Sequence, residues 1–505
     1  MKLLEKIFYW HTSFLSISGL AFGNAGTSAY DQAVQTLNSA PTTISSILQN
    51  TPEIYEYSSR FDGKSSVAYK GQIFRWVLMN DFKSFIAQQS RGQYPGSKEE
   101  AKESLESFLL YRFDNDSSAP GVISGISEFQ VTAKDILGTS MQISEGFIYD
   151  EIQSPGSQLL DKLAGNDNPL RLNGLKGWAS GTVFGVNLIQ IDLDGKKDSF
   201  FEPEDFIAAW IDVLAQEMST GQGFEVPNGS LSKQVVTEAY VTKTGIDVAE
   251  LLQKFMFSSI AFSQALEDYL NPNKGLLVDN TQAQKPEVNY TALEHHWDEG
   301  FGYFGAAQDY LKYTSKQINA QESIDTNKDG KISLLSEKNF THARNAGRFD
   351  VSAVVPTNFA NDIMSHFLMG RHLMTQRPSE YQKYVNACAA IIANRWEATI
   401  AATSIHYIKN LSSALNTYNT PNYSFKNIAK FWSELKGFSL AFQFNPNSSI
   451  NNSDFELFHR LIGDSPKIPG IHSDAELEKY KIDLLEAKNM LQRSFNFDPQ
   501  NVAVW

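Results

Sequence analysis

The segment Glu294-His295-His296-Trp297-Asp298-Glu299-Gly300-Phe301-Gly302-Tyr303-Phe304-Gly305 (294–305) indicates a helix with buried polar chemistry, since it combines histidines, carboxylates, aromatic residues and glycines. On a helix His295 and His296 lie four and three residues before Glu299, so imidazole and carboxylate share one face. Such donors suit iron, zinc or manganese, and H-x-x-E pairs build metal sites inside helical bundles. The segment therefore predicts a metal site with His296 and Glu299 as ligands and the remaining ligands drawn from His295, Asp298, Glu397, His406 and Glu434. The alternative is a capped helix end whose histidines bond backbone carbonyls.

Part of this segment recurs later in the chain. Trp297-Asp298-Glu299 is followed by Gly302-Tyr303, and Trp432-Ser433-Glu434 by Gly437-Phe438, each time after a long apolar helical stretch. The pattern W-x-E-x-x-G-aromatic predicts a duplication with repeats at about 245–305 and 380–442. A duplicated bundle would place Glu299 and Glu434 at equivalent points on two facing helices. The alternative is that both helices bury tryptophan and use glycine for close approach.

Apolar residues at helical spacing predict a mainly α protein, a large helical bundle with long loops and at most a small β element. The strongest helical segments are 100–113, 204–218, 248–270, 290–315, 360–374, 380–410, 426–442 and 474–493. Sustained alternation of apolar and polar residues is confined to Gln190–Leu193 and Val235–Val241, the two expected strand pieces.

Charge and cysteine content exclude several classes of function. The 505 residues carry 57 acidic and 43 basic side chains, a net charge of −14, so nucleic acid and anionic membrane surfaces are not expected partners. A single cysteine, Cys388, excludes an internal disulfide, a thiolate zinc site and a cysteine-held iron–sulfur cluster. After the N-terminal region no stretch reaches the roughly 18 apolar residues of a membrane span.

The N-terminus favours export. Lys2 and Lys6 precede the apolar run Phe14–Phe22, and small residues follow, so residues 1–23 are expected to act as a signal peptide. The alternative is a short N-terminal helix. Residues 24–52, rich in Ser, Thr, Asn and Gln, are expected to form a linker or a loosely docked helix. No cysteine follows the apolar run, so we expect a periplasmic or otherwise exported protein that is not a lipoprotein through its own cysteine.

The segment 325–337 resembles a calcium-binding loop preceded by a helix at about 307–322. Oxygen donors stand at the first, third and fifth positions, and Gly330 allows the sharp turn. The twelfth position is Ser336, and the glutamate arrives one residue late as Glu337. The predicted calcium ligands are Asp325, Asn327, Asp329, Lys331, Ser333 and Glu337. The alternative is a turn rich in Asx residues.

A second acidic loop contains Asp192, Asp194 and Asp198. Its spacing fits no standard calcium loop, because Lys196 occupies the fifth position when counting starts at Asp192. It is a weaker calcium candidate, and the acids after it are equally suited to capping the helix expected at 204–218.

A dozen ordered sequence blocks resemble the bacterial domain-of-unknown-function family 4856. They begin at Phe61-Asp62-Gly63-Lys64-Ser65-Ser66 and include Tyr149–Gln153, the 294–305 segment and Asn345–Asp350. The resemblance covers most of residues 52–450, so residues 53–450 are expected to form the family's helical domain and 451–505 a C-terminal helical extension. It implies an exported protein encoded near imelysin-like proteins and outer-membrane receptors in iron-acquisition loci. The relation to imelysin is an analogy, since Glu294 stands where the imelysin G-x-H-x-x-E motif has glycine.

Three functions follow from these patterns. The first is an exported, non-catalytic metal-binding protein accessory to iron or other metal uptake, with an outer-membrane receptor or an imelysin-like protein as partner. Haem held by one histidine is a variant of it. The second is a calcium-stabilised structural or adhesive surface protein, in which the 294–305 segment serves packing. The third is a metal-dependent hydrolase, which needs three protein ligands, an open position and a nearby base. The motifs H-E-x-x-H and G-x-S-x-G are absent, so an enzyme is the less favoured class.

Overall fold

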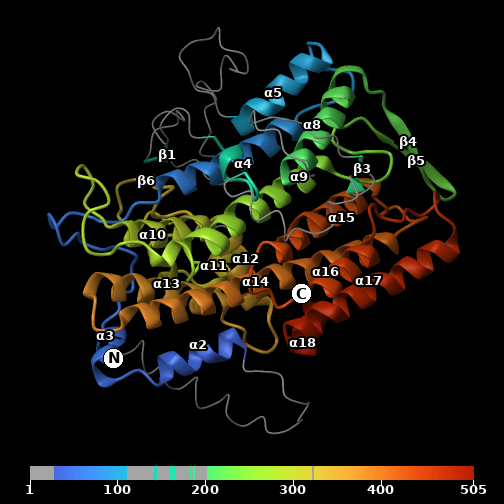
Figure 1. Ribbon diagram of the computed structural model, residues 1–505. Coiled ribbons are helices and arrows are strands. Elements are labelled where there is room, and N and C mark those ends of the chain that lie inside the picture. The colour runs from blue at the N-terminus through green and yellow to red at the C-terminus, as the bar shows by residue number, and fades with distance from the viewer. Residues whose placement is uncertain are drawn as a thin grey trace.

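The computed structural model describes residues 28–110, 142–144, 158–166, 182–183, 186–187, 202–320 and 324–505, and these form a mainly α-helical protein (Figure 1). The predicted fold class is therefore confirmed. The α-helices are α2 (Ala29–Asn38), α3 (Thr42–Gln49), α4 (Lys70–Ala87), α5 (Lys98–Leu110), α8 (Pro203–Thr220), α9 (Val248–Met256), α10 (Ala292–Phe304), α11 (Ser315–Asn319), α12 (Thr341–Ser352), α13 (Phe359–Gln376), α14 (Tyr381–Leu415), α15 (Phe425–Ser439), α16 (Asn452–Ile462), α17 (Asp474–Ser494) and α18 (Pro499–Val504).

The strands are short. In the described ranges they form three separate pairs: β1 (Gln142–Ile143) parallel to β6 (Lys331–Ile332), β2 (Thr182–Val183) antiparallel to β3 (Val186–Asn187), and β4 (Phe224–Asn228) antiparallel to β5 (Leu231–Val236). The strand piece expected at 235–241 is thus mostly a loop, because β5 ends at Val236. The piece expected at 190–193 lies outside the described residues. The β4–β5 hairpin lies at the edge of the molecule (Figure 1).

Helix α14 is the centre of the packing. It has 35 residues, about 52 Å of helix at 1.5 Å per residue, and packs against α2, α12, α13, α15 and α17. Buried alanines over 387–402 leave room for these neighbours to approach, and the large side chain of Trp396 is fully buried among them. Figure 1 shows α13 and α14 side by side, with α2 on their outer face. The stretch expected to be a linker or loosely docked helix thus holds two helices over 29–49, and α2 packs on α14 through Ala33.

The helix predicted over 248–270 begins as α9 and continues as two π-helical segments, η4 (Phe257–Phe262) and η5 (Gln264–Tyr269). Nearly all of its side chains are buried against α4, α10 and α15. The helix predicted over 290–315 ends earlier, because Gly305 adopts a left-handed conformation with φ +76°. The short 3₁₀ segment η7 (Tyr310–Lys312) and α11 follow it in place of the helix expected at 307–322 before the calcium-type loop.

Candidate functional site

The beginning of α10 is set by a capping box. The Thr291 hydroxyl accepts the backbone N–H of Glu294 at 3.1 Å, and the Glu294 carboxylate accepts the backbone N–H of Thr291 at 2.9 Å. Two of the backbone donors that open the helix are thereby satisfied. Glu294 is buried, so it holds the helix start from inside the protein and leaves its other oxygen to face α13.

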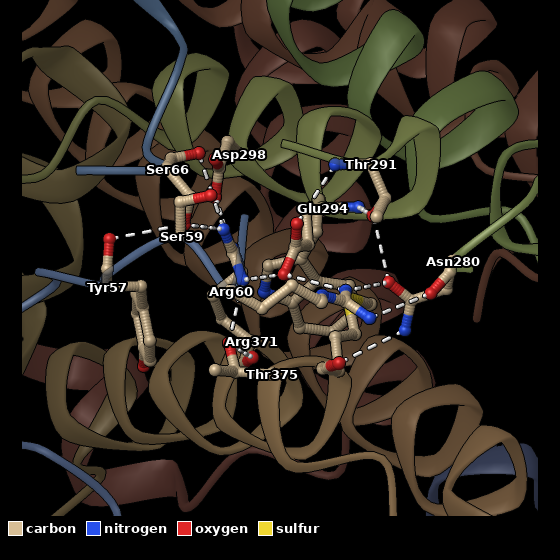
Figure 2. Close-up of polar contacts among 12 residues, drawn as sticks. Tyr57, Ser59, Arg60, Ser66, Asn280, Thr291, Glu294, Asp298, Arg371 and Thr375 are labelled. Carbon is tan, nitrogen blue, oxygen red and sulfur yellow. Dashed lines mark hydrogen bonds and ion pairs between the residues drawn. The ribbon is translucent and has the colours of Figure 1, made fainter. Parts of the chain in front are cut away.

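Arg371, on α13, lies at the centre of a buried ion network (Figure 2). Its guanidinium is fully buried and pairs with Asp298 at 2.9 Å and with Glu294 at 3.1 Å, while Ser66 and Thr375 accept its remaining hydrogen bonds at 2.8 and 2.9 Å. Burial raises the pKa of Asp298, and the charge of Arg371 opposes that rise. A buried charge requires such a set of partners, so α10 and α13 are locked together through this arginine.

The chain between residues 55 and 68 completes the network. The Tyr55 hydroxyl donates to Asp298 at 2.7 Å, the backbone N–H of Ala68 donates to the other Asp298 oxygen at 3.0 Å, and Arg60 reaches Glu294 at 3.2 Å. Asp298, a predicted metal-ligand candidate, therefore directs both carboxylate oxygens into this network. Three parts of the chain that are far apart in sequence, 55–68, α10 and α13, therefore meet at one buried point (Figure 2).

The two histidines of α10 each contact a backbone carbonyl. Nδ1 of His295 lies 3.0 Å from the carbonyl oxygen of Ala68, and Nδ1 of His296 lies 3.0 Å from that of Gly275. A carbonyl only accepts, so each Nδ1 is the donor and each Nε2 of a neutral ring is left as an acceptor. The backbone contacts expected from the capped-helix alternative are therefore present.

Glu299 lies beside His295 rather than His296. Its Oε2 is 3.8 Å from His295 Nε2, and its Oε1 accepts a hydrogen bond from Gln72 of α4 at 2.7 Å. Within the described residues no ion pair joins Glu299 to His296, because the ring of His296 is turned toward Gly275. The His295 and Glu299 side chains are 23% and 15% exposed, so this is a partly open pair of donors.

The other predicted ligands lie in separate surroundings. Nε2 of His406 is held by Arg348 at 2.7 Å and Asn410 at 2.8 Å, and burial together with the Arg348 charge lowers the pKa of His406 to about 4. Glu434 accepts the Tyr407 hydroxyl at 3.0 Å. Across the described ranges no group of three or more His, Cys, Asp and Glu side chains is placed to hold a metal ion. In the described structure the seven predicted ligands are thus not gathered into one centre, since they contact different partners in different parts of the helical body.

The repeated W-x-E-x-x-G pattern has a packing role in both places. A Cβ on Gly302 would lie 2.9 Å from the Gln72 side chain on α4, and a Cβ on Gly437 would lie 2.6 Å from that of Lys254 on α9. Each glycine therefore allows two helices to cross closely. Glu299 accepts a hydrogen bond from Gln72 of α4, and Glu434 lies 3.9 Å from Lys254 of α9. Each glutamate therefore faces the same helix that the glycine of its pattern packs against.

The calcium-type loop adopts the turn that its sequence predicts. The Asp325 carboxylate accepts the N–H groups of Asp329 and Gly330, Asn327 accepts that of Asp329, and Asp329 accepts that of Lys331. Gly330 has φ +83°, and Lys331 begins strand β6. A carboxylate oxygen can accept more than one bond, so Asp325 and Asp329 retain acceptor capacity.

Glu337 is bonded within the same loop. It is buried, with Oε1 accepting from Thr326 and Asn327 and Oε2 accepting from the N–H of Ser333 at 2.8 Å. The second acidic loop (Asp192, Asp194 and Asp198) and the N-terminal segment 1–23 lie outside the described residues. In the described part of the chain, no helix combines the length and the apolar composition that crossing a membrane requires.

Sequence reasoning overlooked Arg371 and Tyr55, which hold the network together. A signal for Arg371 was present: an arginine stands within the apolar run that became α13, and a charged residue on a buried face requires a partner of opposite charge. Tyr55 carried no comparable signal, because its partner Asp298 is 243 residues away.

Replacing Arg371 by leucine should lower the free energy of unfolding by about 3–5 kcal/mol, since two buried carboxylates would lose their counter-charge. The matched control is Lys479→Met, which breaks the exposed pair with Asp483 and should change stability by less than about 1 kcal/mol. Urea unfolding followed by tryptophan fluorescence measures both. Equal effects of the two substitutions would contradict the structural role of Arg371.

Glu397, another predicted ligand, should make stability pH-dependent. It is fully buried, accepts the N–H of Ser449 at 3.0 Å, and burial raises its pKa to about 7. The folded state then binds the proton more tightly than the unfolded state, so this contribution to stability is full at low pH and falls as pH rises through 7.

Between pH 5 and pH 8 the stability of Glu397→Gln should therefore rise by about 2–3 kcal/mol relative to wild type, because glutamine cannot ionise. The exposed control Glu478→Gln should show no such trend. Urea midpoints at the two pH values are the measurement, and parallel curves for Glu397→Gln and wild type would contradict the assignment.

The comparison with known families covers the part of the chain that holds these features. The family described as Domain of unknown function (DUF4856) matches residues 204–457, about half of the sequence, including α10, the 325–337 loop, α13, α14 and α15. No curated protein and no solved structure matches the chain. The chain with this arginine-centred helical body belongs to the DUF4856 family.

Proposed function

We propose that this chain is a non-catalytic, exported structural protein that is stabilised by calcium at the 325–337 loop. One observation carries the proposal: the carboxylates and histidines of the 294–305 segment are bonded internally, whereas the 325–337 loop presents exposed oxygen donors around a sharp turn. The predicted positions offer oxygen donors, with Lys331 at the seventh position contributing its backbone carbonyl, and calcium prefers such donors. Export rests on the N-terminal apolar run and on the family resemblance.

The donor set of this loop fits calcium at its first, third and fifth positions, which are Asp325, Asn327 and Asp329. The fit is weaker at the end, because Ser336 stands at the twelfth position and Glu337 is bonded to loop N–H groups. Binding would therefore require a small rearrangement that draws the loop carboxylates together. We expect a modest dissociation constant, on the order of 10⁻⁴–10⁻³ M, as in extracellular modules.

Calcium should raise the stability of the wild-type chain. With a dissociation constant of about 1 mM, 10 mM calcium adds about 1.4 kcal/mol to the free energy of unfolding, because the ion binds only the folded loop. The increase should vanish in Asp325→Asn and Asp329→Asn and persist in the control Asp474→Asn at an exposed site. Urea unfolding with calcium or with chelator measures it, and equal midpoints for wild type in both would refute the calcium role.

A second candidate function, accessory to uptake of iron, zinc or manganese, is favoured by the His295–Glu299 pair. The hydrogen bond from His295 Nδ1 to the Ala68 carbonyl turns the Nε2 of His295 toward Glu299 and leaves it as an acceptor. Metal-ligating histidines typically donate the N–H of the nitrogen that does not bind the metal in this way. Two protein donors leave further coordination positions for a partner, such as an outer-membrane receptor or an imelysin-like protein.

Metal analysis of the purified chain by plasma mass spectrometry tests this candidate. Bound iron, zinc or manganese should be lost in His295→Ala and Glu299→Gln and retained in His296→Ala, since His296 is turned toward Gly275. Loss in all three variants, or no transition metal in wild type, would contradict a site at His295 and Glu299.

A further inference from the structure

Asp309 is a buried carboxylate beside the 325–337 loop. It lies on the turn between α10 and η7 and is 4% exposed, and within the described residues neither of its carboxylate oxygens has a hydrogen-bond partner at normal distance and angle. A buried carboxylate in this state is costly unless a proton or a cation neutralises it. The three acids of the 294–305 segment all accept hydrogen bonds from protein donors, whereas the oxygens of Asp309, four residues after that segment, lack such bonds in the described structure.

Asp309 is held against the end of the calcium-type loop. Hydrogen bonds join the turn that carries it to the segment 336–339: Ala307 N–H to the Asn339 side chain at 2.8 Å, Gln308 N–H to the Ser336 carbonyl at 2.9 Å, and the Tyr313 hydroxyl to the Glu337 carbonyl at 3.2 Å. The position of Asp309 beside this loop is therefore fixed by the backbone on both sides.

The surroundings of Asp309 add negative charge. Burial is the main cause that raises the pKa of Asp309, Lys312 opposes it, and the charge of Glu337 raises it further. The Thr326 hydroxyl donates to Glu337 at 2.9 Å and also lies close enough to Asp309 to lower the pKa of that carboxyl, which places both carboxylates beside the same loop residue. Two carboxylates with one shared hydroxyl between them form a group of oxygen donors that attracts a cation.

We propose that Asp309 is a ligand of the calcium ion bound at the 325–337 loop and supplies the carboxylate that the loop lacks at Ser336. The inference rests on the proposed function, because it names a ligand for the same ion. A loop whose twelfth residue is serine then obtains its closing carboxylate from the turn after α10. The charge at Asp309 raises affinity in the way that added carboxylates do in other calcium loops.

The test is isothermal titration of calcium chloride into the full chain after treatment with chelator. Asp309→Asn should weaken calcium binding by about tenfold or more, because one ligand charge is lost. Asp325→Asn should weaken it as well, and Asp474→Asn should leave it unchanged. In chelator, Asp309→Asn should unfold at the wild-type urea concentration or above it, because the substitution removes an unpaired buried carboxylate.

The outcomes separate the inference from the function on which it rests. Binding that is lost in Asp325→Asn and unchanged in Asp309→Asn would keep the calcium loop and overturn the role of Asp309, leaving it as a protonated acid. No calcium binding by wild type would overturn both. An Asp309→Asn chain that is less stable than wild type in chelator would show that the carboxylate supports the fold, and would also overturn the inference.

Discussion

The buried guanidinium of Arg371 is the constraint on which much of the structure depends. Removing a charged group from water costs several kcal/mol, and only nearby opposite charges with hydrogen bonds offset that cost. Asp298 and Glu294 supply the charges, and Ser66 and Thr375 accept the remaining donors. These two of the three carboxylates on α10 thereby become part of the protein interior. Two carboxylates of a segment whose composition suggested a metal centre supply the counter-charge of an arginine on the neighbouring helix.

The same principle operates at the second copy of the tryptophan–glutamate–glycine pattern. Lys254 on α9 is buried, pairs with Glu250 at 2.7 Å and lies 3.9 Å from Glu434 on α15. Gly437 permits this approach as Gly302 does on α10. In both crossings a tryptophan is fully buried, a glycine removes the steric barrier and a glutamate meets a polar residue of the opposite helix. The repeated pattern thus specifies how helices cross.

The 325–337 loop is coupled to this helical body at its far end. Gly305 ends α10, and its carbonyl accepts the N–H of Phe340, the residue that precedes α12, at 2.7 Å. The loop therefore connects the end of α10 to the start of α12, and an ion that binds only the folded loop would stabilise this connection. Calcium bound at this loop would therefore stabilise the connection between α10 and α12.

Periodicity alone determined the helical class and most helix positions, because burial on one face leaves a local signal of 3.6 residues. It identified α8, α13, α14 and α17 within a few residues. The spacing of the calcium-type loop also identified the turn at Gly330, where a positive φ is a local requirement. The end of α10 was missed, because a helical pattern of apolar residues continues past Gly305 while the left-handed glycine ends the helix.

The site was decided by tertiary structure. Which carboxylate of 294–305 faces which partner depends on Arg371 and Tyr55, which lie 73 and 243 residues from Asp298 in the chain. Spacing places His295, His296 and Glu299 on one face, but the carbonyls of Ala68 and Gly275 set the direction of each ring. The sequence determined which donors the chain carries. Only the packing of α4, α10 and α13 decided which of these donors are bonded inside the protein, because the energy of a buried charge depends on neighbours that are distant in the sequence.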